Sequence, residues 1–522
     1  METSMLTFEN SKFPKADRFF RRKRRMKLKK IRLAMGLLCI LLAVAGCSKK
    51  KTEVSAPENN RGTVEDHTDA ANGSKNAAGE SGKAANEDTG AAAGSNGSVN
   101  GSAGAADTGV DSAVEAVEVS AEELIEKEIR GSFDYFWKET QTDPDSKGYG
   151  LNRDGNTGDR DFASIASTGF ALSAYTVGAE KGYITLEEGK ERSLKTLLTV
   201  RDELENIDGF YYHFYHLSTG EPYDVEVSTI DTALLLCGAI VSGEYFGGEV
   251  KEVAEEIYER VQWDQIVKSN NRFYMAYEPE EDGTMKKTGE WDVAAEQLMM
   301  YILGAGSPTY PVPGEMFYGF QRWKAVYGDY TYIRSWSNSL FAYQFSHAYI
   351  DFRDKTDRTG VDWFENSVQA ALASRQFSID HKDESKTYRE NSWGLTACLG
   401  KKGYNGLYGA EPNGMPQGKP LGANDGTIAL YGAIASMPFT PEFSQDAMLN
   451  YYINYPETWG PYGFYESYNL DIGTNGHVTK CYLGIDKGIT LMQLANYQDG
   501  FIWDLFMSNE YVQNGMKACE VQ

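Results

Sequence analysis

Apolar residues recur at helical spacing along most of the chain after residue 120. Ser120-Ala-Glu-Glu123 and Thr185-Leu-Glu-Glu188 have the form of capping boxes, and Pro441 stands just inside another helix start. The pattern predicts helices near 120–138, 163–181, 185–206, 228–246, 248–263, 290–305, 314–326, 338–355, 360–379, 425–437, 441–453, 486–497 and 499–508.

These predicted helices are of two kinds. Segments such as 185–206 and 248–263 are amphipathic, whereas those that begin near 163, 228, 290, 338, 425 and 486 are apolar nearly all round. A helix that is apolar all round is buried, and an amphipathic helix covers it with its apolar face. Six inner helices with outer ones interleaved predict an all-α (α/α)6 toroid with long aromatic loops and short β-hairpins. The thirteenth helix would pack at the edge, and an open helical array is the competing architecture.

The first 47 residues have the features of an export signal. Basic residues precede an apolar run from Leu33 to Ala45, which is too short to span a bilayer but suits a signal peptide. The run ends in Val44-Ala45-Gly46-Cys47, which resembles the bacterial lipobox, where the peptide is cut before a cysteine that becomes lipidated. Met26 would make a complete start. We expect an exported protein with a lipid anchor at Cys47; an uncleaved membrane anchor is the alternative.

The rest of the chain divides into a linker, 48–118, and a head, 119–522. The linker contains no Phe, Trp or Tyr up to Ser120 and is rich in Ala, Gly, Ser and Asn, so it cannot bury a core and is predicted to be disordered. The chain's 33 Tyr, 24 Phe and 9 Trp therefore fall almost entirely in the head. The net charge of −24 argues against nucleic-acid binding, because phosphates require a basic surface.

Polar and acidic residues cluster where the inner helices begin. In a toroid the inner helices run the same way, so these residues would meet at one mouth. The clusters contain Arg153, Asp154, Asp161, Glu226, Ser228, Asp231, Trp291, Asp292, Glu296, Asn424, Asp425 and Asp486. Aromatic loops lie between the helices, at 209–215, Trp393 and 459–464. Sugar faces stack on aromatic rings and carboxylates accept hydroxyl hydrogen bonds, so we expect a neutral oligo- or polysaccharide ligand.

A helix-capping role competes with function for each of these acids. For Asp425 and Asp486 capping alone is the better interpretation, although both stay candidates for substrate binding. Ser228 is the better cap of its helix, so Asp231 requires another role. Glu296 stands between Ala295 and Gln297-Leu-Met-Met-Tyr inside a helix that is predicted to be buried, where a carboxylate is costly unless it is paired or functional. Burial would raise its pKa, as a general acid requires.

Several segments together resemble the bacterial glycoamylase-like domain, in order over about residues 125–510. These segments are Ala166–Tyr175, Ser228–Leu235, Glu296–Pro308, Phe345–Arg353, Trp393–Ala397, Asp425–Ala429 and Phe501–Trp503. The domain includes the endo-β-1,2-glucanases of glycoside hydrolase family 144 and is related to a domain of cyclic β-1,2-glucan synthases. The resemblance implies an (α/α)6 fold, no metal or other cofactor, and an inverting attack by water.

The resemblance also carries over to single residues. Glu296 stands where the family has an essential glutamate, Asp231 lies in the family's Ser-Thr-x-Asp segment, and Arg153-Asp154 matches a loop before the first inner helix. His347, Asp351 and Arg353 fall in a family segment, although a buried structural ion pair explains the last two equally well. The chain departs from the family at Cys398-Leu399-Gly400, where an acidic residue is expected.

We therefore predict an inverting hydrolase with Glu296 as the acid and Asp231, or its neighbours Glu226 and Asp154, as the base or a sugar anchor. Such carboxyl groups lie roughly 6.5–9.5 Å apart. The further substrate-binding candidates are Arg153, His347, Asp351, Arg353, Trp393, Asp425, Trp459 and Asp486. A surface glycan-binding lipoprotein without catalysis is the alternative of another class, and a hydrolase or transglycosylase acting on another glucan linkage is a third.

No metal site is predicted. The chain has 6 His residues, scattered, with no His-Glu-x-x-His, and its cysteines show no Cys-x-x-Cys spacing. His213 and His216 could be ligands, but they fit better as the polar tips of an aromatic hairpin.

Overall fold

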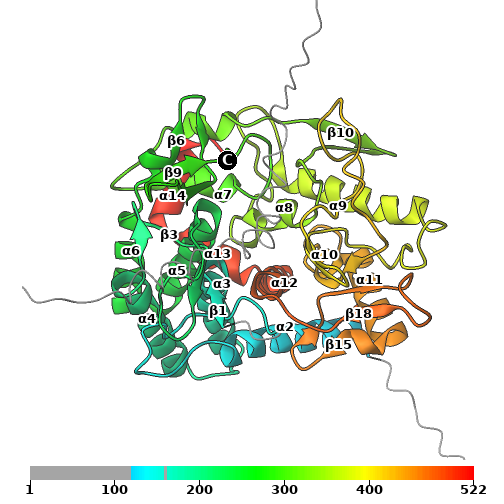
Figure 1. Cartoon of the computed structure of the whole chain (residues 1–522), viewed down its shortest axis with the longest axis horizontal. Coiled ribbons are helices and arrows are strands. Elements are labelled where there is room, and N and C mark those ends of the chain that lie inside the picture. Colours follow the sequence, from blue (N-terminus) through cyan, green and yellow to red (C-terminus); the bar gives the residue numbers. More distant parts are fainter. Residues whose placement is uncertain (1–118, 158–160) are drawn as a thin grey trace, which may run out of the picture. The chain divides into compact units, whose positions relative to one another are not determined.

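A computed structural model describes residues 119–157 and 161–522 (Figure 1). The predicted signal peptide with Cys47, the predicted linker and residues 158–160 lie outside this described part. Within it, the predicted helical architecture is confirmed: helices dominate, and the strands are short.

The helices that are buried on nearly every side are those predicted to be internal. They are α3 (Ile165–Glu180), α5 (Thr229–Phe246), α7 (Leu298–Gly306), α8 (Phe341–Gln344) with the 3-10 turn η4 (Ser346–Ala348), α10 (Leu430–Ile434) and α12 (Gly484–Asp499). By length and composition α5 could cross a membrane, but most of it is buried inside the protein, as expected of a core helix.

The inner helices contact one another in succession. α3 packs on α5, α5 on α7, α10 on α12, and α12 on α3 again. Hydrogen bonds join the remaining neighbours: Met299 N, in α7, donates to Ser346 Oγ in η4 at 3.0 Å, and Gln344 Nε2 in α8 donates to the Gly432 carbonyl in α10 at 2.9 Å. The sequence of contacts therefore returns to its starting helix.

A second set of helices covers the first. It comprises α2 (Ala121–Lys138), α4 (Leu186–Asp202), α6 (Glu249–Glu259), α9 (Trp363–Asp380), α11 (Pro441–Asn454), α13 (Phe501–Ser508) and α14 (Glu510–Ala518). α2 packs on α3 and α12, α4 on α3 and α6, α11 on α10, and α14 on α7. In Figure 1, α4 and α6 lie outside α3 and α5, and α9 lies outside α8.

The strands form small antiparallel sheets, most of them in the loops between helices. The pairs are β1 (Phe162–Ser164) with β4 (Phe214–His216), β2 (Asn206–Ile207) with β3 (Phe210–Tyr211), β6 (Val267–Lys268) with β7 (Arg272–Phe273), β10 (Lys324–Tyr327) with β11 (Tyr330–Ile333), β12 (Cys398–Gly400) with β13 (Gly403–Asn405), and β15 (Trp459–Gly460) with β16 (Gly463–Phe464). The three-stranded sheets are β5 (Val227–Ser228), β8 (Ala276–Pro279) and β9 (Met285–Thr288), and β14 (Ile428–Ala429), β17 (Ser467–Asn469) and β18 (His477–Thr479). Three of these strands, β1, β5 and β14, lead directly into inner helices and so fix where each helix begins.

Local sequence explains where α2, α4 and α5 begin. Thr185 and Glu188 form a reciprocal capping box on α4, and the Ser120 and Ser228 hydroxyls accept from backbone N–H groups of α2 and α5. Small residues then let the inner helices approach closely. A Cβ on Gly238 of α5 would lie only 1.9 Å from the Gly169 carbonyl oxygen of α3, so the two backbones touch there.

Several predicted boundaries are wrong. Residues 314–326 form the 3-10 helix η3 (Gly314–Tyr318) followed by β10, because Gly319 packs against the Asn271 carbonyl and a tight turn at Gly328 pairs β10 with β11. The third inner helix starts at Leu298 rather than 290, 338–355 is split into α8 and η4, and 425–437 shrinks to α10. The prediction omitted α14. Two further 3-10 turns are η2 (Trp263–Ile266) and η5 (Pro456–Thr458).

Candidate active site

Asp231 lies in the first turn of α5, held by the residue that caps the helix. The Asp231 N–H donates to Ser228 Oγ at 3.3 Å, and the Ser228 hydroxyl in turn donates to Asp231 Oδ2. The predicted cap is therefore confirmed, and it also orients the carboxylate. The helix N-terminus favours a negative charge at this position.

Glu296 stands in the turn before α7, two residues ahead of the helix rather than inside it as predicted. Ser346 fixes this turn by donating to the Glu296 carbonyl oxygen at 2.5 Å while accepting from Met299 N. The side chain is half-buried. Loss of water around it, together with the charge of the nearby Asp231, raises its pKa from 4.5 to about 7. Glu296 and Asp231, predicted to meet, are therefore close enough to interact.

His213 is a member of this site that the sequence analysis did not assign to it. Its Nε2 lies 3.7 Å from Asp231 Oδ2, and its ring stacks on Phe214 at 3.8 Å. Burial by itself lowers its pKa, but the charges of Asp231, Glu226, Asp154 and Asp224 outweigh burial and leave the pKa raised. Two predicted substrate-binding acids, Glu226 and Asp154, are thereby brought together with Asp231.

Arg153 and Asp154 join the beginnings of α3 and α12. The Gly484 N–H donates to the Asp154 carbonyl at 2.7 Å, and Asp154 N donates to the Phe162 carbonyl at 3.1 Å. The Arg153 side chain forms an ion pair with Glu139 at 3.2 Å. The negative charge of Asp154 acts on both His213 and Asp486, so Asp154 lies between two groups of acids.

The second group is a buried pair of carboxyl groups, Asp486 and Glu466. Burial raises the pKa of Asp486 well above its usual value, and the charge of Glu466 and a hydrogen bond to it raise it further. Two adjacent buried carboxylates cannot both remain ionised, so the pair holds a proton at neutral pH. Asp486 lies in the first turn of α12, which begins at Gly484, so the predicted capping role is wrong.

The segment Cys398-Leu399-Gly400, where the sequence departs from the glycoamylase-like family, lies beside this pair of carboxyl groups. Leu399, on β12, donates its N–H to Glu466 Oε1 at 3.0 Å. The neighbouring Cys398 thiol is buried, and burial together with the charges of Glu466, Asp486 and Asp425 raises its pKa well above normal. The strand β12 therefore orients an acid through its backbone. We call His213, Glu226, Asp231, Glu296, Asp154, Glu466 and Asp486 the mouth cluster.

Glu466 and His213 share a sequence context that could have indicated them. Each follows a Gly-Phe-Tyr segment whose glycine, Gly209 or Gly463, has a positive φ (83° and 86°). Each segment is a tight hairpin turn on the way to an inner helix, and each places a polar residue just after buried aromatic rings. That repeated pattern, rather than helical periodicity, marks these two residues.

Other predicted substrate-binding residues lie elsewhere. Trp393 is fully buried at 0% exposure, so it is a core residue and not a sugar platform. His347 is buried among Phe352, Phe364 and Phe439, and burial lowers its pKa to about 3, so it is a neutral core residue. Both predictions are corrected by this burial.

The remaining candidates have local partners. Asp351 and Arg353 form a bidentate pair at 2.9 Å that is partly exposed, not buried, after η4. Asp425 Oδ1 accepts from Thr427 N and Oγ1 five residues before α10 begins, so it does not cap that helix. Trp459 lines a pocket on α2, described below.

Within 119–157 and 161–522, His, Cys, Asp and Glu side chains do not gather in threes or more with a geometry that could hold a metal ion. The mouth cluster instead contains two acids, Glu296 and Asp486, whose pKa values are raised chiefly by burial, and a carboxyl group of raised pKa suits proton donation.

Comparisons with known proteins show what this chain is similar to. A family described as "Putative glucoamylase" matches residues 288–510. An exo β-1,2-glucooligosaccharide sophorohydrolase of Parabacteroides distasonis is 26% identical over 76% of this chain, and the chain spans 58% of that relative's length.

Solved structures share the fold. The chain is similar to a putative glucoamylase of Bacteroides uniformis (27% identity, TM-score 0.68, 78% of this chain and 98% of that one). It is also similar to an endo-β-1,2-glucanase of Chitinophaga pinensis in complex with sophorotriose and glucose (26% identity, TM-score 0.67, 77% and 99%). The predicted resemblance to glycoamylase-like proteins is thus supported.

Proposed function

We propose that this protein is a glycoside hydrolase that cleaves internal bonds of β-1,2-linked glucan. The observation that carries the proposal is Glu296, a half-buried carboxyl group whose pKa of about 7 is set by desolvation and by the adjacent Asp231. A purely binding protein has no use for such a proton donor. The activities named for the Parabacteroides and Chitinophaga relatives supply the linkage.

The architecture that we infer is an (α/α)6 toroid. It is supported by the closed succession of contacts from α3 through α5, α7, α8, α10 and α12 back to α3. The covering of these helices by α2, α4, α6, α9 and α11 supports it as well. In a toroid the starts of the inner helices share one end, which accounts for the electrostatic coupling within the mouth cluster.

The reaction follows from the protonation states. Glu296 donates its proton to the glycosidic oxygen as the bond to the anomeric carbon breaks. Asp231, or its neighbour Glu226 or Asp154, accepts a proton from the water that attacks the opposite face, and the product has the inverted configuration. The Asp486–Glu466 pair, which already holds a proton, is able both to donate to and to accept from sugar hydroxyls.

The cellular setting is part of the proposal. The signal-like segment before Cys47 supports export and a lipid anchor, and the aromatic-free linker would hold the head away from the membrane. A neutral glucan outside the cytoplasm is then the substrate, which is compatible with a net charge of −24 because a neutral chain is not repelled.

The decisive test is Glu296→Gln, which keeps the shape of the side chain and removes its proton. We expect the rate on linear β-1,2-glucan to fall about 10²–10⁴-fold, while Glu281→Gln, at an exposed turn, retains wild-type activity. Products of many lengths indicate internal cleavage, and sophorose alone indicates terminal cleavage. Full activity of Glu296→Gln on β-1,2-glucan would refute the assignment, and wild-type cleavage of only another linkage would refute the substrate.

A further inference from the structure

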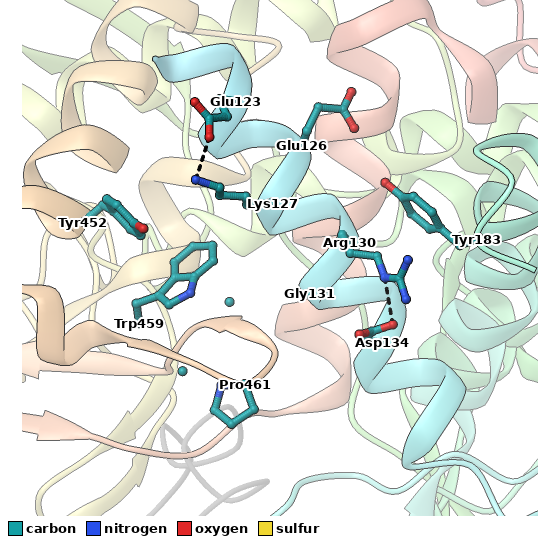
Figure 2. A pocket seen from close by; sticks show the side chains of 12 residues that line it. Glu123, Glu126, Lys127, Arg130, Gly131, Asp134, Tyr183, Tyr452, Trp459 and Pro461 are labelled. Atoms are coloured by element: carbon teal, nitrogen blue, oxygen red, sulfur yellow. Dashed lines mark hydrogen bonds and ion pairs between the residues drawn. The ribbon is translucent and has the colours of Figure 1, made fainter. Parts of the chain in front are cut away.

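A pocket of about 490 Å³ lies on the outer helix α2, and its lining contains no member of the mouth cluster. Figure 2 shows Trp459 and Tyr452 on one side of α2 and Tyr183 on the other. Lys127 and Arg130 of α2 lie between them. The volume is within the usual range for small-ligand sites.

The hairpin β15–β16, which carries Trp459, is fixed rigidly to α2. A Cβ on Gly131 of α2 would lie 2.7 Å from the Tyr462 carbonyl carbon, so the two backbones are in direct contact. The Phe464 N–H donates to Glu128 Oε2 at 2.9 Å, and the Tyr462 hydroxyl donates to Glu139 Oε1 at 3.0 Å. The position of Trp459 relative to α2 is therefore preorganised.

The walls of the pocket are half-buried aromatic rings. Trp459 packs edge-on against Tyr452 and Phe464, with ring centroids 5.1 and 4.8 Å apart. On the opposite side, the Arg130 guanidinium lies 4.7 Å from the centre of the Tyr183 ring. Rings that are braced by neighbours yet partly open offer flat apolar faces at little entropic cost.

Each charged side chain that lines the pocket has an ionic partner. Lys127 pairs with Glu123 at 2.8 Å and Arg130 with Asp134 at 3.0 Å, and Glu126 pairs with Lys181, which lies outside the lining, at 3.1 Å. An ionic ligand would have to compete with these existing pairs. An uncharged polyhydroxylated ligand can donate to the carboxylates and accept from the cationic groups without breaking them.

We propose that this α2 pocket is a second glucan-binding site, separate from the mouth cluster. The inference takes its ligand class from the proposed function. Trp459, which the sequence indicated as a sugar contact, fulfils that role here. A glucan chain held at this pocket stays close to the enzyme while the mouth acts on it, so the pocket raises affinity for polymer without taking part in bond cleavage.

The test measures binding and turnover separately. In the full chain carrying Glu296→Gln, titration calorimetry with a short β-1,2-gluco-oligosaccharide should give two sites, and Trp459→Ala or Tyr183→Ala should leave one. In the chain that retains Glu296, each wall variant should raise KM for the polymer up to about tenfold, the equivalent of one aromatic contact. Their kcat on the short oligosaccharide should stay unchanged.

Controls keep the outcomes distinct. Tyr310→Ala, an exposed tyrosine outside both sites, should change neither stoichiometry nor KM. Trp459 and Tyr183 stand on opposite walls, so misfolding of the hairpin in one variant does not affect the other. If calorimetry still gave two sites in both wall variants, and if their KM for the polymer were unaltered, the proposal of a second glucan-binding site would be overturned. A wild-type chain that binds glucan in the α2 pocket but cleaves none would overturn the proposed function alone.

Discussion

At the scale of single residues, the site depends on neighbours that push proton affinities apart. Desolvation and the Asp231 charge raise the pKa of Glu296 to about 7, whereas the Asp231 carboxylate accepts a hydrogen bond from the Ser228 hydroxyl. An acid and a base at the same pH require this kind of asymmetry.

The pH profile of the reaction should carry the signature of Glu296. Because its pKa is raised to about 7, the donor is protonated below that pH and deprotonates above it. We expect kcat/KM to fall about tenfold per pH unit on the alkaline side, with an apparent pKa near 7. Rates measured across buffers from pH 5 to 9 check this, and an alkaline limb that begins only above pH 9 would be inconsistent with Glu296 as the acid.

The same residue should make stability depend on pH. A carboxyl group whose folded pKa is raised contributes stability at low pH that is lost as the pH rises from about 4.5 to about 7. Glu296→Gln removes that loss, so the variant should be more stable than the wild type at pH 8, by at most about 3 kcal/mol, and similar at pH 4.5. Urea denaturation at the two pH values measures the difference.

At the scale of elements, long runs of apolar residues located the inner helices, because a helix that is buried on all sides is apolar all round. The start of α5 was predictable, since Ser228 and Asp231 form a local capping pattern. His213 and Glu466 were missed because helical periodicity does not mark them: they follow hairpins whose strands are only two residues long, and the repeated Gly-Phe-Tyr context is the signal that indicates them. The turn that carries Glu296 was mistaken for helix because its neighbours are equally apolar.

The contact between α3 and α5 gives a test of the inner packing. Gly238→Ala adds a methyl group where only 1.9 Å separates the new atom from the Gly169 carbonyl oxygen. We expect a loss of about 1–3 kcal/mol in unfolding free energy from overpacking, although alanine favours helix. Gly406→Ala, whose Cβ would meet its nearest neighbour at 3.9 Å, should change stability little in the same denaturation experiment.

A buried ion pair joins α12 to α2 next to the Asp486–Glu466 pair. Lys487 Nζ contacts Glu128 Oε1, and both side chains are at most 5% exposed. Lys487→Met leaves the Glu128 carboxylate buried without its partner, so we expect a loss of about 3–5 kcal/mol. Chemical denaturation should show most of it recovered in Lys487→Met/Glu128→Gln, which still accepts from Phe464 N.

The exposed pair Lys195–Glu191 is the matched control for that experiment. Its side chains are 47% and 59% exposed, and Lys195→Met should change the stability little, because an exposed ion pair is screened by solvent. An equal loss at the two positions would mean that the Lys487 pair is solvated and does not anchor α12.

At the scale of the whole molecule, the chain combines a head that is proposed to hydrolyse glucan with an N-terminal segment that is predicted to direct it to a membrane. A tethered enzyme would meet a polymer at a surface, where the proposed α2 pocket would raise its affinity for the glucan. The proposed tether and the proposed pocket would therefore complement each other, and a single substitution tests each of them.

The tether is tested at Cys47. If the thiol of Cys47 carries the lipid, Cys47→Ser removes the only atom to which the acyl-bearing group is attached, and the exported head should move from the membrane fraction to the soluble fraction. Fractionation with detection of the head measures this, and Cys39→Ser, at the other cysteine of the signal region, is the matched control. Retention of Cys47→Ser in the membrane would instead indicate an uncleaved apolar segment, and the glucanase activity of the released head should match that of the wild type because the mouth cluster is unchanged.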